Sequence, residues 1–117
     1  MVCHLIDCNH MALGEIVVAA PAARVPRAIV KWVSLYTPVP WPAGIPTNPE
    51  LDQEAGGTRP GDFALDVTTL LATVERLTAR EGRGDWPQHP DFGPMSEGDW
   101  LRWGYLHMNH HLRQFGQ

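Results

Sequence analysis

Histidines gather near the C-terminus of this 117-residue chain, where positions 107, 110 and 111 hold three of its six. His107 and His111 are four residues apart, so on an α-helix their side chains point only about 40° apart. Such an H-x-x-x-H pair can present two imidazole nitrogens to one metal ion, although histidines at this spacing can also serve only as hydrogen-bonding residues. His110 falls on the opposite face of the same helix. The spacing therefore selects His107 and His111 as a candidate metal-binding pair and sets His110 apart.

Two imidazoles do not make a tight site, so a third ligand must come from elsewhere in the chain. His4 is the best candidate, because on an N-terminal helix it shares a face with Cys8 beside an apolar stripe. Three neutral imidazoles favour zinc, nickel or another borderline divalent cation. They also leave coordination positions open, which is typical of a catalytic metal site.

The remaining candidate residues are the two cysteines and an isolated histidine. Cys3 and Cys8 lie about 140° apart around one predicted helix, which excludes a disulfide between them. Reduced thiols are typical of a cytoplasmic protein. We interpret Cys8, one turn from His4, as a small buried thiol, with a fourth ligand or a nucleophile as the alternatives. We interpret His89, followed by Pro90, as a hydrogen-bonded loop residue and not a ligand.

Four segments carry the signals of helices that would position these residues. They run from the N-terminus to about residue 18, from about 25 to 35, from the region after Pro60 to Gly82, and from Ser96 to Gly116. The last begins at a near capping box, with Asp99 in place of the usual glutamate. No stretch alternates as a half-buried strand does, so we expect an all-α fold.

Apolar spacing predicts which faces of the last two helices are buried. On the third segment the predicted core residues are Phe63, Val67, Leu70, Val74 and Leu77. On the fourth they are Leu101, Tyr105, Met108, Leu112 and Phe115.

Between the second and third segments lies a loop, residues 37–61, that holds six of the chain's 11 prolines. A structureless loop of this length is unusual in a compact domain. Trp41 and Ile45 indicate that it folds back over the helices as a cover. An extended, solvent-exposed connector is an equal alternative.

Composition limits the classes of partner. With 44% hydrophobic and 19% charged residues, the chain can bury a core, and its length predicts a single domain spanning residues 1–117. The net charge is −4 and no basic patch is present, which argues against nucleic acids and anionic membranes as partners. The first residues lack the regions of a signal peptide, so we expect a cytoplasmic protein.

Several motifs together resemble a known superfamily. They are H-P-D-F-G-P-M-S at 89–96, Y-L-H-M-N-H-H-L-R-Q-F-G at 105–116, P-W-P-A-G-I-P-T at 40–47 and T-R-P at 58–60. The chain is similar in these motifs to an uncharacterised, domain-of-unknown-function branch of the DinB-like superfamily. The resemblance implies an antiparallel four-helix bundle with long crossover loops and a three-histidine divalent metal site. The superfamily's ligand pattern maps onto His4, His107 and His111.

The resemblance also implies a class of reaction. Characterised DinB-like proteins include metal-dependent transferases that use low-molecular-weight thiols such as bacillithiol or mycothiol, and a thiol-dependent maleylpyruvate isomerase. We therefore expect a thiol S-transferase that joins a small-molecule thiol to an electrophile, with the loop 37–61 closing the site. The alternatives are a non-catalytic binding or stress-response module with a structural or vestigial metal site, and a bundle whose histidines only hydrogen-bond.

The chain departs from the superfamily at its N-terminus. Superfamily members begin with a further helix upstream of the position of His4, so we expect the first helix of the bundle to be missing here. Its absence would leave an apolar groove to be filled by a partner chain, as in a homodimer, by rearrangement or by aggregation.

Overall fold

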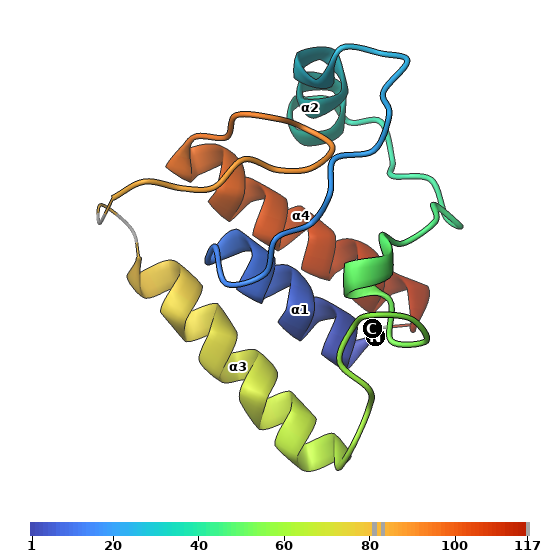
Figure 1. Ribbon diagram of the computed structural model, residues 1–117, viewed down its shortest axis with the longest axis vertical. Helices are drawn as coiled ribbons and strands as arrows, with labels where there is room; N and C mark the ends of the chain where they lie inside the picture. The colour runs from blue at the N-terminus through green and yellow to red at the C-terminus, as the bar shows by residue number, and fades with distance from the viewer. Residues whose placement is uncertain (81, 83, 117) are drawn as a thin grey trace. The chain divides into compact units, whose positions relative to one another are not determined.

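The computed structural model of the protein describes residues 1–80, 82 and 84–116, and the named secondary-structure elements in this part of the chain are all helices. These residues form four α-helices and one 3₁₀ helix: α1 (Val2–Ala12), α2 (Arg27–Tyr36), η1 (Pro49–Leu51), α3 (Phe63–Ala79) and α4 (Glu97–Gln114) (Figure 1). The described residues contain no strand, and no helix among them has the length and apolar character that a membrane span requires. The all-α prediction is confirmed.

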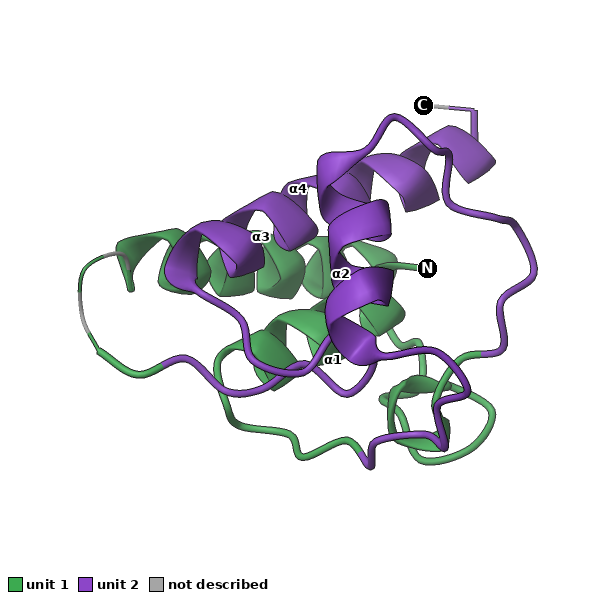
Figure 2. Ribbon diagram, turned by 90° about the horizontal axis from the view of Figure 1, so that it is seen from above, with its two compact units in different colours: residues 1–18, 47–85 green, residues 19–46, 86–117 purple. Residues whose placement is uncertain are grey.

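The chain divides into two compact units, each assembled from segments that are distant in sequence (Figure 2). Unit 1 comprises residues 1–18 and 47–85 and contains α1, η1 and α3. Unit 2 comprises residues 19–46 and 86–117 and contains α2 and α4. The proline-rich loop 37–61 contributes to both units.

In unit 1, α1 and α3 lie side by side and run in the same direction (Figure 1). Near their N-termini the Cys3 thiol donates a hydrogen bond to Asp66 at 3.5 Å. Further along, the Asn9 side-chain amide donates to the Thr73 hydroxyl at 3.0 Å. Residue numbers rise together along both helices, so this pair is parallel. The long connection between α1 and α3 makes a parallel pair sterically accessible, because it returns the chain to the end where α1 began.

The helix boundaries follow local chemistry. Ser96 caps α4 by accepting a hydrogen bond from the Asp99 backbone N–H at 3.1 Å, and the Asp99 carboxylate accepts one from the Ser96 N–H at 2.9 Å. This confirms the predicted capping box. By contrast, α1 ends at Ala12, six residues before the predicted end. The cause is Gly14, whose φ of +79° lies in the left-handed region where glycine commonly terminates helices.

The predicted buried face of α3 is correct except at its first residue. Leu77 is buried, and Val67, Leu70 and Val74 are half-buried. Phe63, however, is 73% exposed. Because the start of α1 lies level with Asp66, Phe63 extends past the part of α3 that α1 covers.

The predicted buried face of α4 is correct only at Leu101 and Met108, which are half-buried. Tyr105, Leu112 and Phe115 are exposed, while Trp100, Trp103 and Gly104 are buried. The Trp100 indole is also hydrogen-bonded, because its Nε1 donates to the carbonyl of the half-buried Pro87 at 2.9 Å. Burial of the two indoles removes a large apolar surface from water, and it turns this face of α4 inward.

In unit 2, Asp99 joins α2 to the N-terminal turn of α4. Lys31 lies 3.3 Å from its carboxylate, and the Tyr36 hydroxyl donates a hydrogen bond to it. The Arg102 guanidinium lies 5.2 Å from the centre of the Tyr36 ring, and its Nε donates to the Leu35 carbonyl. Burial favours a higher pKa for Asp99, but the hydrogen bonds from Tyr36, the backbone and Lys31 outweigh it and lower that pKa.

The loop 37–61 is folded back at two points and exposed between them. In unit 2 the Trp41 indole donates to the Ser34 carbonyl at 2.8 Å. In unit 1 Leu51 is buried, within the short helix η1. Ile45 is 64% exposed, so the expectation that it would anchor a cover is wrong.

Candidate metal-binding site

The side chains of His107 and His111 converge on α4, as their spacing predicts. Their Nε2 atoms are 3.1 Å apart, and their ring planes are perpendicular. A tetrahedral ion at about 2.0–2.1 Å from two nitrogens holds them about 3.3 Å apart. His110 is directed elsewhere, since its Nε2 lies 3.0 Å from the Gln114 side-chain amide. The separation of His107 and His111 is therefore close to that of two ligands sharing one ion.

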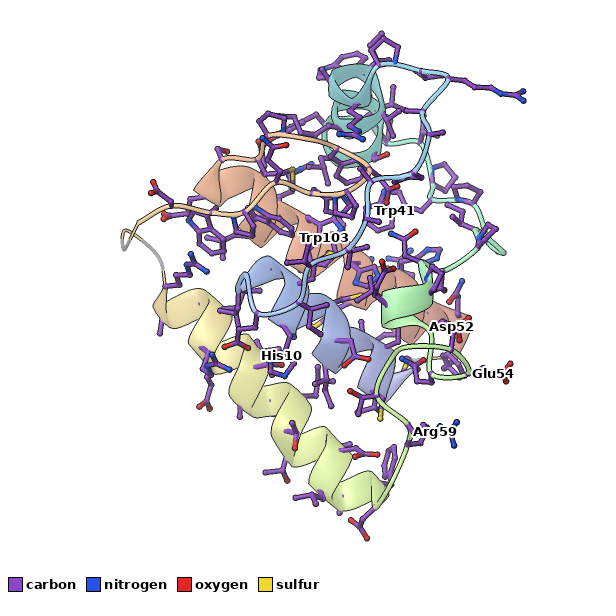
Figure 3. The ribbon with its side chains drawn as sticks, in the orientation of Figure 1. His10, Trp41, Asp52, Glu54, Arg59 and Trp103 are labelled. Atoms are coloured by element: carbon purple, nitrogen blue, oxygen red, sulfur yellow. The ribbon has the colours of Figure 1, made fainter. Side chains whose placement is uncertain are left out.

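Within unit 2 two indoles lie beside the His107 ring. They belong to Trp103 and Trp41, which are labelled in Figure 3. The Trp103 ring stacks on it, with centroids 4.8 Å apart and an interplanar angle of 12°. Trp41, from the loop 37–61, lies 6.2 Å away on a tilted plane. Sequence reasoning did not find this role for Trp103, although its position one turn before His107 was a usable signal.

His89 stabilises the turn that precedes α4. Its Nδ1 accepts hydrogen bonds from the backbone N–H groups of Asp91 and Phe92 at 3.0 and 3.3 Å. Its ring stacks on Phe92 and meets Trp103 edge-on. Burial lowers the pKa of His89 to about 3, so the imidazole is neutral. These contacts agree with the interpretation of His89 as a hydrogen-bonded loop residue.

In unit 1, a backbone carbonyl fixes the orientation of His4. The His4 Nδ1 atom lies 3.0 Å from the Leu51 carbonyl oxygen. Because a carbonyl only accepts hydrogen bonds, Nδ1 carries the proton and Nε2 is the basic nitrogen. Metal-ligating histidines are typically held in this way, with the other ring nitrogen donating to a carbonyl or carboxylate. Leu51 could not be found from sequence, because a main-chain atom provides the contact.

A tightly folded turn presents that carbonyl to His4. The Gly57 N–H donates to the Asp52 carbonyl at 2.7 Å, and a Cβ atom at Gly57 would lie 2.8 Å from the same oxygen. At the end of the turn, the backbone N–H and the hydroxyl of Thr58 donate to the buried Asp7 carboxylate, at 2.7 and 2.6 Å. Helix α1 thus carries both His4 and, three residues later, the acid that anchors the turn.

Cys8 is a buried thiol one turn after His4. Its Sγ lies 3.6 Å from His4 Nε2 and 3.9 Å from Nδ1. Burial, and secondarily Asp7, raise the pKa of the Cys8 thiol above its ordinary value. Both Cys3 and Cys8 are free cysteines, so the exclusion of a disulfide is confirmed.

Comparison with known proteins gives one family. Residues 39–117, about two-thirds of the chain, match the family described as "Protein of unknown function (DUF1569)". This span contains the His107–His111 pair, whereas His4 and Cys8 precede it. No curated protein and no solved structure matches the chain. The protein belongs to the DUF1569 family.

Proposed function

We propose that this protein binds a divalent metal ion, zinc or nickel, through His107, His111 and His4. The observation that carries the proposal is the 3.1 Å separation of the His107 and His111 Nε2 atoms. The third ligand is inferred from the DinB-like resemblance, and the donation of His4 Nδ1 to the Leu51 carbonyl supports it by directing metal binding to Nε2.

The reaction that best suits such a site is transfer of a small-molecule thiol. The imidazoles of His4, His107 and His111 would hold the ion, which would supply open positions and lower the pKa of a thiol bound there. The sulfur would form a bond to an electrophilic carbon while the bond from that carbon to its leaving group breaks. The thiol proton would pass to solvent, and the leaving group would depart with its bonding electrons and take up a proton from solvent. The half-buried Trp41 beside His107 would form an apolar wall for the acceptor.

A hydrogen bond between His107 and His111 is the competing explanation of the same distance, and metal analysis separates the two. We expect untagged protein, reconstituted with zinc or nickel and desalted, to retain close to one ion per chain. His111→Ala should abolish retention, because one imidazole of the converging pair is lost. His110→Ala is the matched control on the same helix and should retain the ion.

Two results would contradict the proposal: no retained metal in the unsubstituted protein, or equal losses in His110→Ala and His111→Ala. Assays of the metal-loaded protein with a panel of thiols and model electrophiles then test the transferase. Stoichiometric metal without turnover would instead favour a non-catalytic module with a structural site.

A further inference from the structure

We propose that two copies of this chain pair through an apolar stripe on α4, with their α4 helices antiparallel. The stripe consists of Leu101, Tyr105, Met108, Leu112 and Phe115, and we call it the α4 stripe. The inference goes beyond metal binding, because it assigns a partner and a surface that the proposed function does not use.

The α4 stripe has the sequence pattern of a buried surface. Its residues follow at intervals of four, three, four and three, so they share one side of α4 along about 21 Å of helix. This spacing is typical of a helix that packs along another helix. In the single chain, however, Tyr105, Phe115 and Leu112 are 68%, 61% and 41% exposed. The pattern and the exposure are reconciled if a second helix covers the stripe.

The contacts between α4 and α2 lie on a different face of α4. Asp99 accepts hydrogen bonds from Lys31 and Tyr36, and the Arg102 Nε donates to the Leu35 carbonyl. On an α-helix, Asp99 and Arg102 point about 160° and 100° away from the middle of the stripe. Packing of α2 within unit 2 therefore leaves the stripe uncovered.

A second copy of the stripe fits the first when the two helices are antiparallel. The intervals read almost the same in both directions from Met108, so a two-fold axis there superposes one stripe on the other. Leu101 of one copy then meets Phe115 of the other, and Tyr105 meets Leu112. Each of these pairs joins a large ring to a smaller side chain, which favours close packing. The two Met108 side chains meet at the axis, where their flexibility lets them fill the remaining space.

The charges on α4 favour the antiparallel arrangement over the parallel one. The first turn carries Glu97 and Asp99, and the last turn carries His111 and Arg113. Antiparallel helices bring the acidic end of each copy towards the basic end of the other and oppose their macrodipoles, whereas parallel helices bring like charges together. The stripe itself contains no charged residue, so pairing buries no charge within it.

The area of the stripe suits a small dimer interface. An aromatic side chain buries about 150–250 Å², so the exposed parts of Tyr105 and Phe115 offer about 250 Å² together. The three aliphatic side chains raise the apolar area to about 400 Å². Because about 60% of an interface is apolar, this corresponds to about 1,300 Å² buried in total. That value lies at the lower end of the range for specific interfaces, so we expect dissociation in the micromolar range.

Analytical ultracentrifugation of the full, untagged chain gives the first test. We expect the mass to rise from 13.0 kDa to twice that value over a micromolar concentration range. A chelator in the buffer makes the result independent of the proposed metal site, and added zinc should not be required. A chain that stays monomeric throughout would overturn the proposal. If such a monomer sediments with phosphatidylcholine vesicles, the stripe covers a lipid surface instead.

Lysine substitutions locate the interface. We expect Tyr105→Lys and Leu112→Lys each to weaken pairing at least about thirtyfold, because the change occurs twice in a symmetric dimer and places a charge against apolar side chains. Both side chains are exposed in the single chain, so circular dichroism should show both variants folded. Trp32→Lys is the matched control, because Trp32 is a 60% exposed aromatic residue on α2 of the same unit. Dimers that survive both α4 changes, or that are lost only in Trp32→Lys, would exclude the α4 stripe.

Disulfide cross-linking tests the direction of the two helices. We expect Met108→Cys to form a cross-linked dimer under mild oxidation, because residue 108 lies at the two-fold axis. Leu101→Cys should not, since the two copies of residue 101 would lie about 21 Å apart. The unsubstituted protein, in which Cys3 and Cys8 are buried, is the control for background oxidation. Efficient cross-linking of Leu101→Cys would contradict the antiparallel arrangement.

Discussion

At the scale of the residue, two different constraints act on the candidate ligands. The Leu51 carbonyl selects the tautomer of His4, and so the nitrogen available to a metal. The stacked Trp103 ring instead restricts rotation of the His107 imidazole. The His107–His111 pairing could be predicted from sequence because helical geometry alone produces it. The two constraints could not be predicted from sequence. The constraint on His4 comes from a main-chain oxygen, and the constraint on His107 comes from an indole whose direction depends on which face of α4 is buried.

The neutral, buried His89 gives a pH-dependent stability. Its pKa is about 3 in the folded protein, below the ordinary value for histidine, because burial disfavours the charged form. The unfolded chain thus binds more protons between about pH 3 and 6.5, and stability falls as the pH decreases through this window. We expect a loss on the order of 4 kcal/mol from His89 across it, seen as a declining urea midpoint.

The matched variant for this prediction is His89→Asn. Its side-chain oxygen can replace Nδ1 as the acceptor for the Asp91 and Phe92 N–H groups, but it does not titrate. We expect the slope of stability against pH to flatten between about pH 4 and 6.5 in this variant. An unchanged slope would assign the acid sensitivity to other groups.

At the scale of the element, the segment from Leu51 to Thr58 is hydrogen-bonded to α1 at both of its ends. We call this pair of connections the clamp. The Asp7 carboxylate accepts two hydrogen bonds from Thr58, and His4 Nδ1 donates one to the Leu51 carbonyl at the other end of the turn. The position of the turn on α1 therefore controls the orientation of His4. The helices themselves were largely predictable, since capping and apolar periodicity are local. Which face of α4 is buried could not be predicted, because it depends on how the indoles of Trp100 and Trp103 pack against the residues before that helix.

Removing one bond of this clamp tests its connection to the metal site. We expect Thr58→Val to reduce stability by about 1–3 kcal/mol, because the buried Asp7 carboxylate loses a donor. Zinc binding should weaken about tenfold as His4 loses its alignment. Urea unfolding and zinc titration measure the two effects.

Thr68→Val is the control, because the Thr68 hydroxyl lies on the exposed face of α3 and donates only to the Ala64 carbonyl. It should change neither stability nor zinc affinity appreciably. A Thr58→Val protein that is destabilised but binds zinc normally would limit the clamp to a structural role.

At the scale of the whole molecule, the proposed ligands differ in their relation to the family. His107 and His111 lie within the residues that match DUF1569, and His4 lies before them. The long connection between α2 and α3 was predictable from its prolines, since no helix can continue through them. The parallel direction of α1 and α3 could not be predicted from sequence, because it depends on contacts between distant segments. These contacts are Cys3–Asp66 and Asn9–Thr73.

Metal binding should stabilise the whole folded chain if the ligands converge only when it is folded. A ligand that binds the native state alone raises the free energy of unfolding by about 2.7 kcal/mol at a hundredfold excess over its dissociation constant. We expect zinc to produce an increase of this size and a chelator to reverse it, as measured by urea unfolding. His110→Ala should respond as the unsubstituted protein does, whereas His111→Ala should not respond. Equal stabilisation of both variants would show that zinc acts elsewhere on the chain, and that the proposed ligands do not bind it.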